Sequence, residues 1–282
     1  MDKLRKILLI ALISTSAGAW IASQVFQEEM MVAMATPYSP MSIPLFAAVW
    51  TAGMAAMMFP AISPVILLYN KLVKSSYSNT TLVVEGVKRP YSVKTALFVG
   101  CYLAVWALTG IVLLLSWSLL LNSAVAATGL SSVVYGLILL VAGAYQFSPL
   151  KAKCLGYCES PMSFFMRRWR SGTAGAATMG TYHGLYCLGC CWPYFLLMVA
   201  LGWMNILWMA LFAGVIFGEK MWSRGIWIAR VAGIGLAIAG LITILGIVDI
   251  SGHATMPSDQ VMPNMDLQGF SEDQTSGNGM DM

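Results

Sequence analysis

The feature that most constrains this chain is a series of long apolar stretches separated by short polar segments. We identify seven such stretches, near residues 7–26, 43–68, 94–119, 129–149, 175–200, 203–219 and 226–249. Each is long enough, or nearly so, to supply the about 20 helical residues that cross a hydrocarbon core. Of the 282 residues, 59% are hydrophobic and 10% are charged, whereas soluble domains carry about 25% charged residues. We therefore predict an all-α fold, a polytopic membrane helix bundle of about seven transmembrane helices.

The distribution of Lys and Arg predicts how this bundle is oriented. All 16 basic residues fall on or near the odd-numbered connections, if the segment before the first span is counted as the first connection. Cytoplasmic loops of membrane proteins carry an excess of Lys and Arg. We therefore expect a multi-pass protein of a prokaryotic plasma membrane, with the N-terminus inside and the C-terminus outside. The net charge of +4 then reflects orientation in the lipid bilayer, and a nucleic-acid partner is not expected.

The first span has an alternative interpretation. A basic start, an apolar run and the small residues Ser16, Ala17, Gly18 and Ala19 are also typical of a cleaved signal peptide. The apolar run continues through residues 20–22, which favours a retained span. Cleavage would leave six spans with the same orientation.

The chain divides into two regions by composition. Residues 1–249 form the predicted transmembrane helical domain, and residues 250–282 form an extracytoplasmic tail rich in Met and Asp. Because this tail has few apolar residues apart from methionine, we expect it to be disordered. Thioether sulfur is a soft metal ligand, so the tail is also a candidate arm for capturing copper, through Met256, Met262 and Met265.

The fifth apolar stretch contains a cluster of potential metal ligands. Cys187, Cys190 and Cys191 occur within five residues, and His183 lies one helical turn upstream. Positions 183, 187 and 191 are four residues apart and would share one helix face. A single cysteine would be interpreted as a small packing residue, but three with a histidine favour a functional site within the membrane. Pro193 should also free one backbone carbonyl, that of Gly189.

Two further groups contain sulfur. Met54, Met57 and Met58 lie on one face of the second span, at a depth close to that of the three thiols. Thioether and thiolate ligands together suit copper(I) better than zinc or magnesium, although methionine also fills gaps in apolar helices. Cys154 and Cys158, four residues apart on the cytoplasmic side, could face one ligand if their segment is helical, an assumption that Gly156 weakens. Cys101 is expected to serve packing.

Several motifs between about residues 50 and 225 resemble a prokaryotic family of uncharacterised proteins, described as predicted metal-binding integral membrane proteins with a domain of unknown function. The matching residues are Trp50, Met54 to Pro60 and Pro64; Ser148 to Lys151, Cys154, Cys158 and Pro161; Gly184 and Cys187 to Trp192; Gly202 to Asn205, Trp208 and Met209; and Glu219 with Lys220. The resemblance implies a multi-pass membrane protein with a role in metal binding.

These observations favour copper(I) capture, transfer or delivery at the plasma membrane. The partners would be a copper donor or acceptor protein, or a membrane copper enzyme for which the chain is an accessory factor. An enzymatic role is disfavoured because the loops are poor in ligands. Two alternatives remain open: a membrane thiol-disulfide oxidoreductase that uses Cys187 and Cys190, and a structural subunit of a membrane complex.

Overall fold

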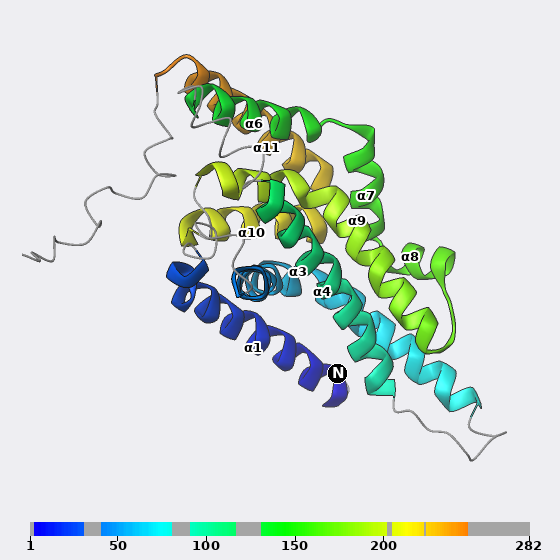
Figure 1. Ribbon diagram of the computed structural model, residues 1–282. Helices are drawn as coiled ribbons and strands as arrows, with labels where there is room; N and C mark the ends of the chain where they lie inside the picture. Colours follow the sequence, from blue (N-terminus) through cyan, green and yellow to red (C-terminus); the bar gives the residue numbers. More distant parts are fainter. Residues whose placement is uncertain are drawn as a thin grey trace, which may run out of the picture.

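All regular structure in the described part of the chain is helical. The computed structural model describes residues 3–30, 41–80, 91–116, 131–201, 205–222 and 224–247. Its helices, drawn in Figure 1, are α1 (Lys3–Val25), α3 (Ser42–Thr80), α4 (Tyr91–Ser116), α6 (Ser131–Tyr145), α7 (Pro149–Glu159), α8 (Pro161–Arg168), α9 (Gly172–Leu201), α10 (Ile206–Met221) and α11 (Gly225–Ile244). The predicted all-α class is confirmed for these residues. The proposed tail, with Met256, Met262 and Met265, lies outside them.

Four of the described helices are long and apolar enough to cross a membrane, namely α1, α3, α4 and α11. A fifth is added if α6 and α7, which meet at a bend of 64°, are counted as one broken span. Helices α9 and α10 occupy the fifth and sixth predicted spans but do not meet this criterion. Helix α10 has only 16 residues, and the first half of α9 carries Thr, Tyr and His. The structure thus supports several apolar spans, and the count of seven is not confirmed.

Helix α9 is the central element of the bundle. It contacts α4, α6, α7 and α10, and it runs diagonally through the ribbon in Figure 1. Helix α3, the other long helix, packs on α1, α4, α8 and α10. A single cluster of buried apolar side chains joins these helices, so residues on α3, α7, α9 and α10 can meet in one core.

Two prolines interrupt the hydrogen bonding of α3, and hydroxyl groups replace the missing donors. Pro60 cannot donate to the carbonyl of Ala56, and the Ser16 hydroxyl of α1 donates to that carbonyl at 2.7 Å. Pro64 likewise leaves the carbonyl of Pro60 free, and the Ser63 hydroxyl donates to it at 2.9 Å. Helix α3 therefore continues through both prolines without an orphaned carbonyl at either site.

The same arrangement occurs in α9. Pro193 removes the donor to the carbonyl of Gly189, and the Tyr145 hydroxyl, from the end of α6, donates to that oxygen. The prediction that Pro193 frees this carbonyl is confirmed. Its consequence is a polar link between α6 and α9, next to the cysteine cluster.

Helices α6 and α11 pack through glycine. A Cβ atom added at Gly143 would lie 2.8 Å from the carbonyl oxygen of Gly233, and one added at Gly240 would lie 2.8 Å from the carbonyl oxygen of Gly136. No side chain can fit between backbones at such distances. Small residues of this kind allow close helix approach in membrane proteins, so α6 and α11 form a tightly apposed pair.

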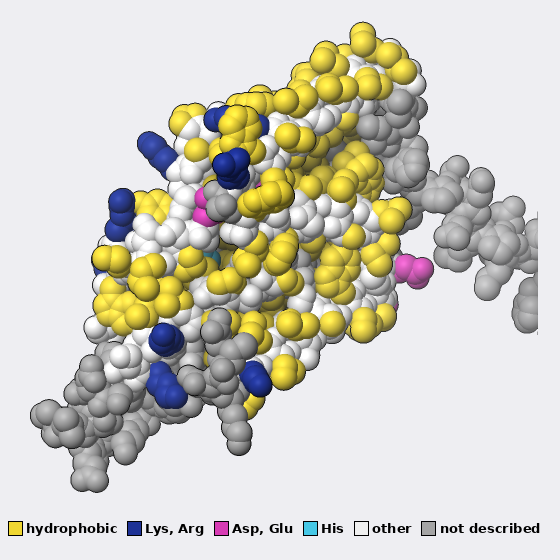
Figure 2. All heavy atoms as spheres, turned by 180° about the vertical axis from the view of Figure 1, so that it is seen from behind, with side chains coloured by type: hydrophobic (Ala, Val, Ile, Leu, Met, Phe, Trp, Pro, Cys, Tyr) yellow, Lys and Arg dark blue, Asp and Glu magenta, His cyan; other side chains and the backbone are white. Residues whose placement is uncertain are grey.

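The basic side chains that are visible on one face of the molecule lie toward one side of it, among hydrophobic side chains. In Figure 2, hydrophobic side chains cover much of the bundle, and the Lys and Arg side chains lie in the left half of the view. One basic side is what the positive-inside rule expects, and the orientation remains a prediction. However, Lys151 and Lys220 are buried in the bundle. These two lysines therefore do not indicate a water-facing side, as the sequence had suggested for all 16 basic residues.

Candidate metal site

Four thiols from two helices meet in the core. Helix α9 places Cys187, Cys190 and Cys191 in fully buried positions, and all are free cysteines. The sulfur atoms of Cys190 and Cys191 lie 3.2 Å apart. Cys158, on α7, adds a fourth thiol, with its sulfur 3.9 Å from that of Cys190. The structure thus joins the two cysteine groups that the sequence had placed in separate segments.

Cys187 is surrounded by a thioether, a phenol and an ammonium group. Its sulfur lies 3.9 Å from Sδ of Met58 on α3 and 3.2 Å from the hydroxyl of Tyr102 on α4. The Nζ atom of Lys220, on α10, lies 2.9 Å from the Cys187 sulfur and 3.7 Å from the Met58 sulfur. A positive charge at hydrogen-bond distance favours a thiolate, which is the form of cysteine that binds metals.

A fully buried ion pair lies beside this group. Lys151 Nζ is 2.7 Å from Oε2 of Glu219, and the Tyr194 hydroxyl donates to the other carboxylate oxygen. Glu219 directly precedes Lys220 on α10, so one helical turn contributes to both polar groups. Burying two charges costs several kcal/mol per ion before their attraction is counted. Such a pair is therefore an expensive feature in an otherwise apolar core.

The remaining predicted sulfur ligands are near the cluster but are not all part of it. Of the three methionines on α3, Met58 contacts Cys187, while Met54 and Met57 are buried in the same core. Cys154 packs against α9, because a Cβ atom added at Gly189 would lie 2.8 Å from its sulfur. Its segment is helical despite Gly156: Ser148 caps α7 by accepting from the Lys151 amide at 3.1 Å.

His183 is buried among aromatic rings. Its ring centroid lies 5.2 Å from that of Phe164, 5.9 Å from that of Tyr102 and 6.1 Å from that of Phe98. Within the described residues, neither ring nitrogen has a hydrogen-bond partner. Buried polar atoms are nearly always paired, so this imidazole, one turn from Cys187, has an unused ligand position.

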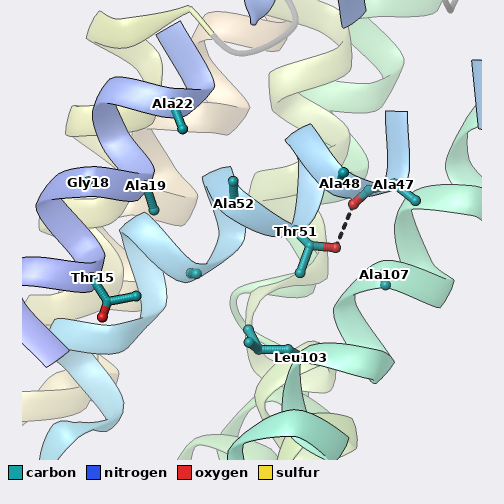
Figure 3. Close-up of a pocket in the computed structure, with 11 residues that line it drawn as sticks. Thr15, Gly18, Ala19, Ala22, Ala47, Ala48, Thr51, Ala52, Leu103 and Ala107 are labelled. Carbon is teal, nitrogen blue, oxygen red and sulfur yellow. Dashed lines mark hydrogen bonds between the residues drawn. The ribbon is translucent and has the colours of Figure 1, made fainter. Parts of the chain in front are cut away.

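The donors are not arranged around a vacant metal position. Among the described residues, no group of three or more His, Cys, Asp and Glu side chains is placed to hold a metal ion. The groove drawn in Figure 3 offers no cluster of metal ligands either. The groove in Figure 3, of about 720 Å³, is lined by small side chains of α1, α3 and α4, with the Thr51 hydroxyl bonded to the Ala47 carbonyl. The candidate site is therefore the closed core around Cys187.

Sequence reasoning did not identify the charged and phenolic members of this site. Lys151, Glu219 and Lys220 belong to the motifs that carry the family resemblance, and this was the available signal. Tyr102 and Tyr194 lie outside those motifs, so no sequence signal pointed to either residue.

A comparison with models of protein families identifies the family of this chain. The sequence model of a family described as "PpoB2: Copper chaperone" matches residues 46–243, which is more than half of the chain. This chain belongs to the PpoB2 copper chaperone family. The PpoB2 match extends from α3 to α11 and includes every sulfur atom described above, whereas the tail methionines lie outside it. No curated protein and no solved structure matches the chain.

Membership of the PpoB2 family agrees with the copper relationship expected from the sequence. The family that matches is described as a copper chaperone rather than as a domain of unknown function, so the more specific resemblance remains a prediction. The same holds for metal binding by individual residues.

Proposed function

We propose that this protein is a membrane copper(I) chaperone that holds its cargo at Cys187 and Met58, with Cys158, Cys190 and Cys191 as adjoining ligands. The observation that carries this proposal is the meeting of four thiols and one thioether from α3, α7 and α9 in a buried core. Such a set of soft donors selects copper(I) over magnesium, calcium or manganese. Copper(I) also accepts low coordination numbers, so Cys187 and Met58 can begin to bind it without a preformed cage.

The surroundings of the cluster suit a cargo that must be protected. All three α9 cysteines are buried, which keeps water and oxidants from a thiolate-bound ion. The unpaired nitrogens of His183 offer a further ligand within one turn of Cys187. Cys154, against Gly189 on the same side as Cys158, provides a sulfur to which copper can move by ligand exchange.

In the cell, we propose copper homeostasis at the plasma membrane through a protein partner. The tail methionines Met256, Met262 and Met265 would collect copper outside, Met54 and Met57 would support Met58, and Cys154 with Cys158 would exchange the ion on the inner side. A copper donor or acceptor protein, or a membrane copper enzyme, would complete the transfer. This route assumes the bilayer, the N-in and C-out orientation, and the division into residues 1–249 and 250–282.

The decisive experiment is copper(I) binding by the purified protein in detergent, under anaerobic reducing conditions. We expect stoichiometric copper in the wild type and none at the core site in the triple variant Cys187→Ser/Cys190→Ser/Cys191→Ser. Cys101→Ser, which changes a cysteine of α4 outside the cluster, is the matched control and should bind as the wild type does. Copper retained by the triple variant would contradict the proposed site.

Methionine variants separate the contact residue from its neighbour. Met58→Leu should weaken copper(I) binding by at least about tenfold, because it removes a soft ligand. Met57→Leu, one residue away and also buried, should change the affinity much less. Equal effects of the two would indicate that the methionines act through packing.

A second candidate function, thiol-disulfide exchange, is favoured by one observation. For the pair Cys187 and Cys190, the Cys190 thiol is directed toward Cys187, with its sulfur 3.1 Å from the Cys187 carbonyl oxygen. A redox role would require a disulfide that forms and opens reversibly. Titration of free thiols after mild oxidation would detect such a disulfide. If all three α9 cysteines were still free thiols after this treatment, the redox role would be excluded.

A further inference from the structure

One cation already contacts both of the sulfur atoms assigned to copper. Lys220 Nζ lies 2.9 Å from the Cys187 sulfur and 3.7 Å from the Met58 sulfur, and the lysine is 4% exposed. An ammonium group and copper(I) carry the same single charge. A copper(I) ion bound to these sulfur atoms would therefore bring a second positive charge against the Cys187 thiolate that the ammonium already contacts.

We propose that the Lys220 ammonium is the resident cation of the metal-free site and that copper(I) replaces it. Copper entry would move the ammonium out of the core, and its return would expel copper toward an acceptor. This inference rests on the proposed function and adds to it a device for release. The exchange makes and breaks only coordination and hydrogen bonds, without any change of oxidation state.

Charge conservation in the core is the first argument for such an exchange. A buried charge that loses its partner destabilises a protein by about 3–5 kcal/mol. If copper(I) joined the Cys187 thiolate while the ammonium stayed and no neighbouring thiol lost its proton, the core would gain an uncompensated positive charge. If copper left with no cation returning, it would leave a buried thiolate unpaired. Exchange of one cation for the other keeps the charge of the core constant in both directions.

The position of Lys220 on its helix is the second argument. It lies in the last turn of α10, and the next two residues, Met221 and Trp222, are 48% and 62% exposed. A lysine stem is long and flexible, and it can stay in apolar surroundings while its ammonium group reaches water. The ammonium can thus leave the core by a side-chain rotation at the helix end.

The contrast with the other buried lysine is the third argument. Lys151 is fixed by Glu219 at 2.7 Å and lies 5.0 Å above the ring of Tyr194. Within the described residues, Lys220 has no carboxylate partner, since the pair of Lys151 and Glu219 is the single salt bridge found there. Its contacts are with the sulfur atoms of Cys187 and Met58, and the thioether is a weak acceptor, whereas a carboxylate and a ring hold Lys151. Of the two lysines, Lys220 is therefore the one that can be displaced.

The test is the rate at which loaded protein in detergent releases copper(I) to an excess of a copper(I) chelator. Lys220→Leu removes the competing charge without adding a ligand. We expect it to keep the copper stoichiometry and to slow release by at least about tenfold, because departure of copper would leave Cys187 without a cation. Lys153→Leu, an exposed lysine of α7, is the control and should release at the wild-type rate.

The outcomes separate this inference from the function on which it rests. Release from Lys220→Leu at the wild-type rate or faster, with full copper content, overturns the exchange and leaves the chaperone proposal intact. A wild-type protein that holds no copper overturns both.

A measurement on the unmodified chain covers the case in which Lys220→Leu does not fold. The wild type is treated with an amine-reactive ester, with and without copper(I), and labelling at Lys220 is followed by mass spectrometry. We expect labelling to rise by about fivefold on copper loading as the ammonium reaches water, relative to Lys153 as internal reference. Unchanged labelling would overturn the proposal.

Discussion

The helices of the α6–α11 pair and those of the core around α9 pack together in opposite ways. In the first, glycines bring two backbones together, with the Cβ position at Gly143 only 2.8 Å from the Gly233 carbonyl. In the second, α9 is surrounded by bulky rings, four thiols and the buried ion pair of Lys151 and Glu219.

The difference shows which region of the molecule retains buried charged groups that packing alone does not require. Close glycine packing gives stable apolar contacts and requires no polar groups. The core around α9 retains two lysines and a carboxylate, although apolar residues of similar size would serve stability as well or better. The α6–α11 pair can thus be understood as scaffold, and the α9 core as the part to which the proposed copper function belongs.

The largest expected effect comes from breaking the ion pair of the α9 core. Glu219→Gln would leave the buried Lys151 ammonium without a countercharge, and we expect a loss of about 3–5 kcal/mol in the free energy of unfolding. Thermal or denaturant unfolding in detergent measures it.

The double variant Lys151→Met/Glu219→Gln provides the control for that prediction. Because it removes both charges, it should recover a large part of the lost stability. A double variant as unstable as Glu219→Gln alone would show that the carboxylate acts through something other than this pair.

The α6–α11 pair should respond to added volume instead of lost charge. In Gly143→Ala the new methyl group would meet the backbone of α11, and the helices must separate, at a cost of about 1–3 kcal/mol. Gly235→Ala is the matched variant on α11, because the space at Gly235 is open within 4 Å. It should be neutral or slightly stabilising in the same unfolding assay. A similar cost for both would refute the close-packed interface.

The smallest effect is expected at the link between the two regions. Tyr145→Phe removes the hydroxyl that donates to the carbonyl of Gly189 but keeps the ring against Trp192, 5.0 Å away. We expect a loss of about 1 kcal/mol in unfolding free energy. Unchanged stability would indicate that another group satisfies this carbonyl.

The sequence predicted those parts of the molecule that depend on local periodicity. The helical class, the α9 face with Cys187, and the carbonyl freed by Pro193 follow from spacing along one segment. The fourth predicted span ends at residue 149, where α7 begins, but the sequence did not predict that α7 turns back to pack on α9. The span expected over residues 203–219 corresponds to α10, which has 16 residues, and whether it crosses the membrane remains a prediction.

The residues of the candidate site were harder to predict from the sequence, because they depend on which helices pack against each other. Lys220 was assigned to a cytoplasmic connection from its charge, and only the packing of α10 on α3 and α9 places its ammonium beside sulfur. The proximity of the Cys158 and Cys190 sulfur atoms likewise requires α7 to fold back on α9. Spacing along the chain contains no information on such contacts.

The hydroxyl of Ser16 connects the N-terminal helix α1 to α3, so removal of the N-terminal segment would affect α3. It donates at 2.7 Å to the carbonyl of Ala56, two residues before Met58 on α3. A signal peptidase that cut after Ala19 would remove this donor and leave the carbonyl unpaired in apolar surroundings. N-terminal processing would then alter the support of α3, the helix that carries the proposed ligand Met58, and under the proposed function the trimmed and untrimmed forms would differ in how firmly they hold copper.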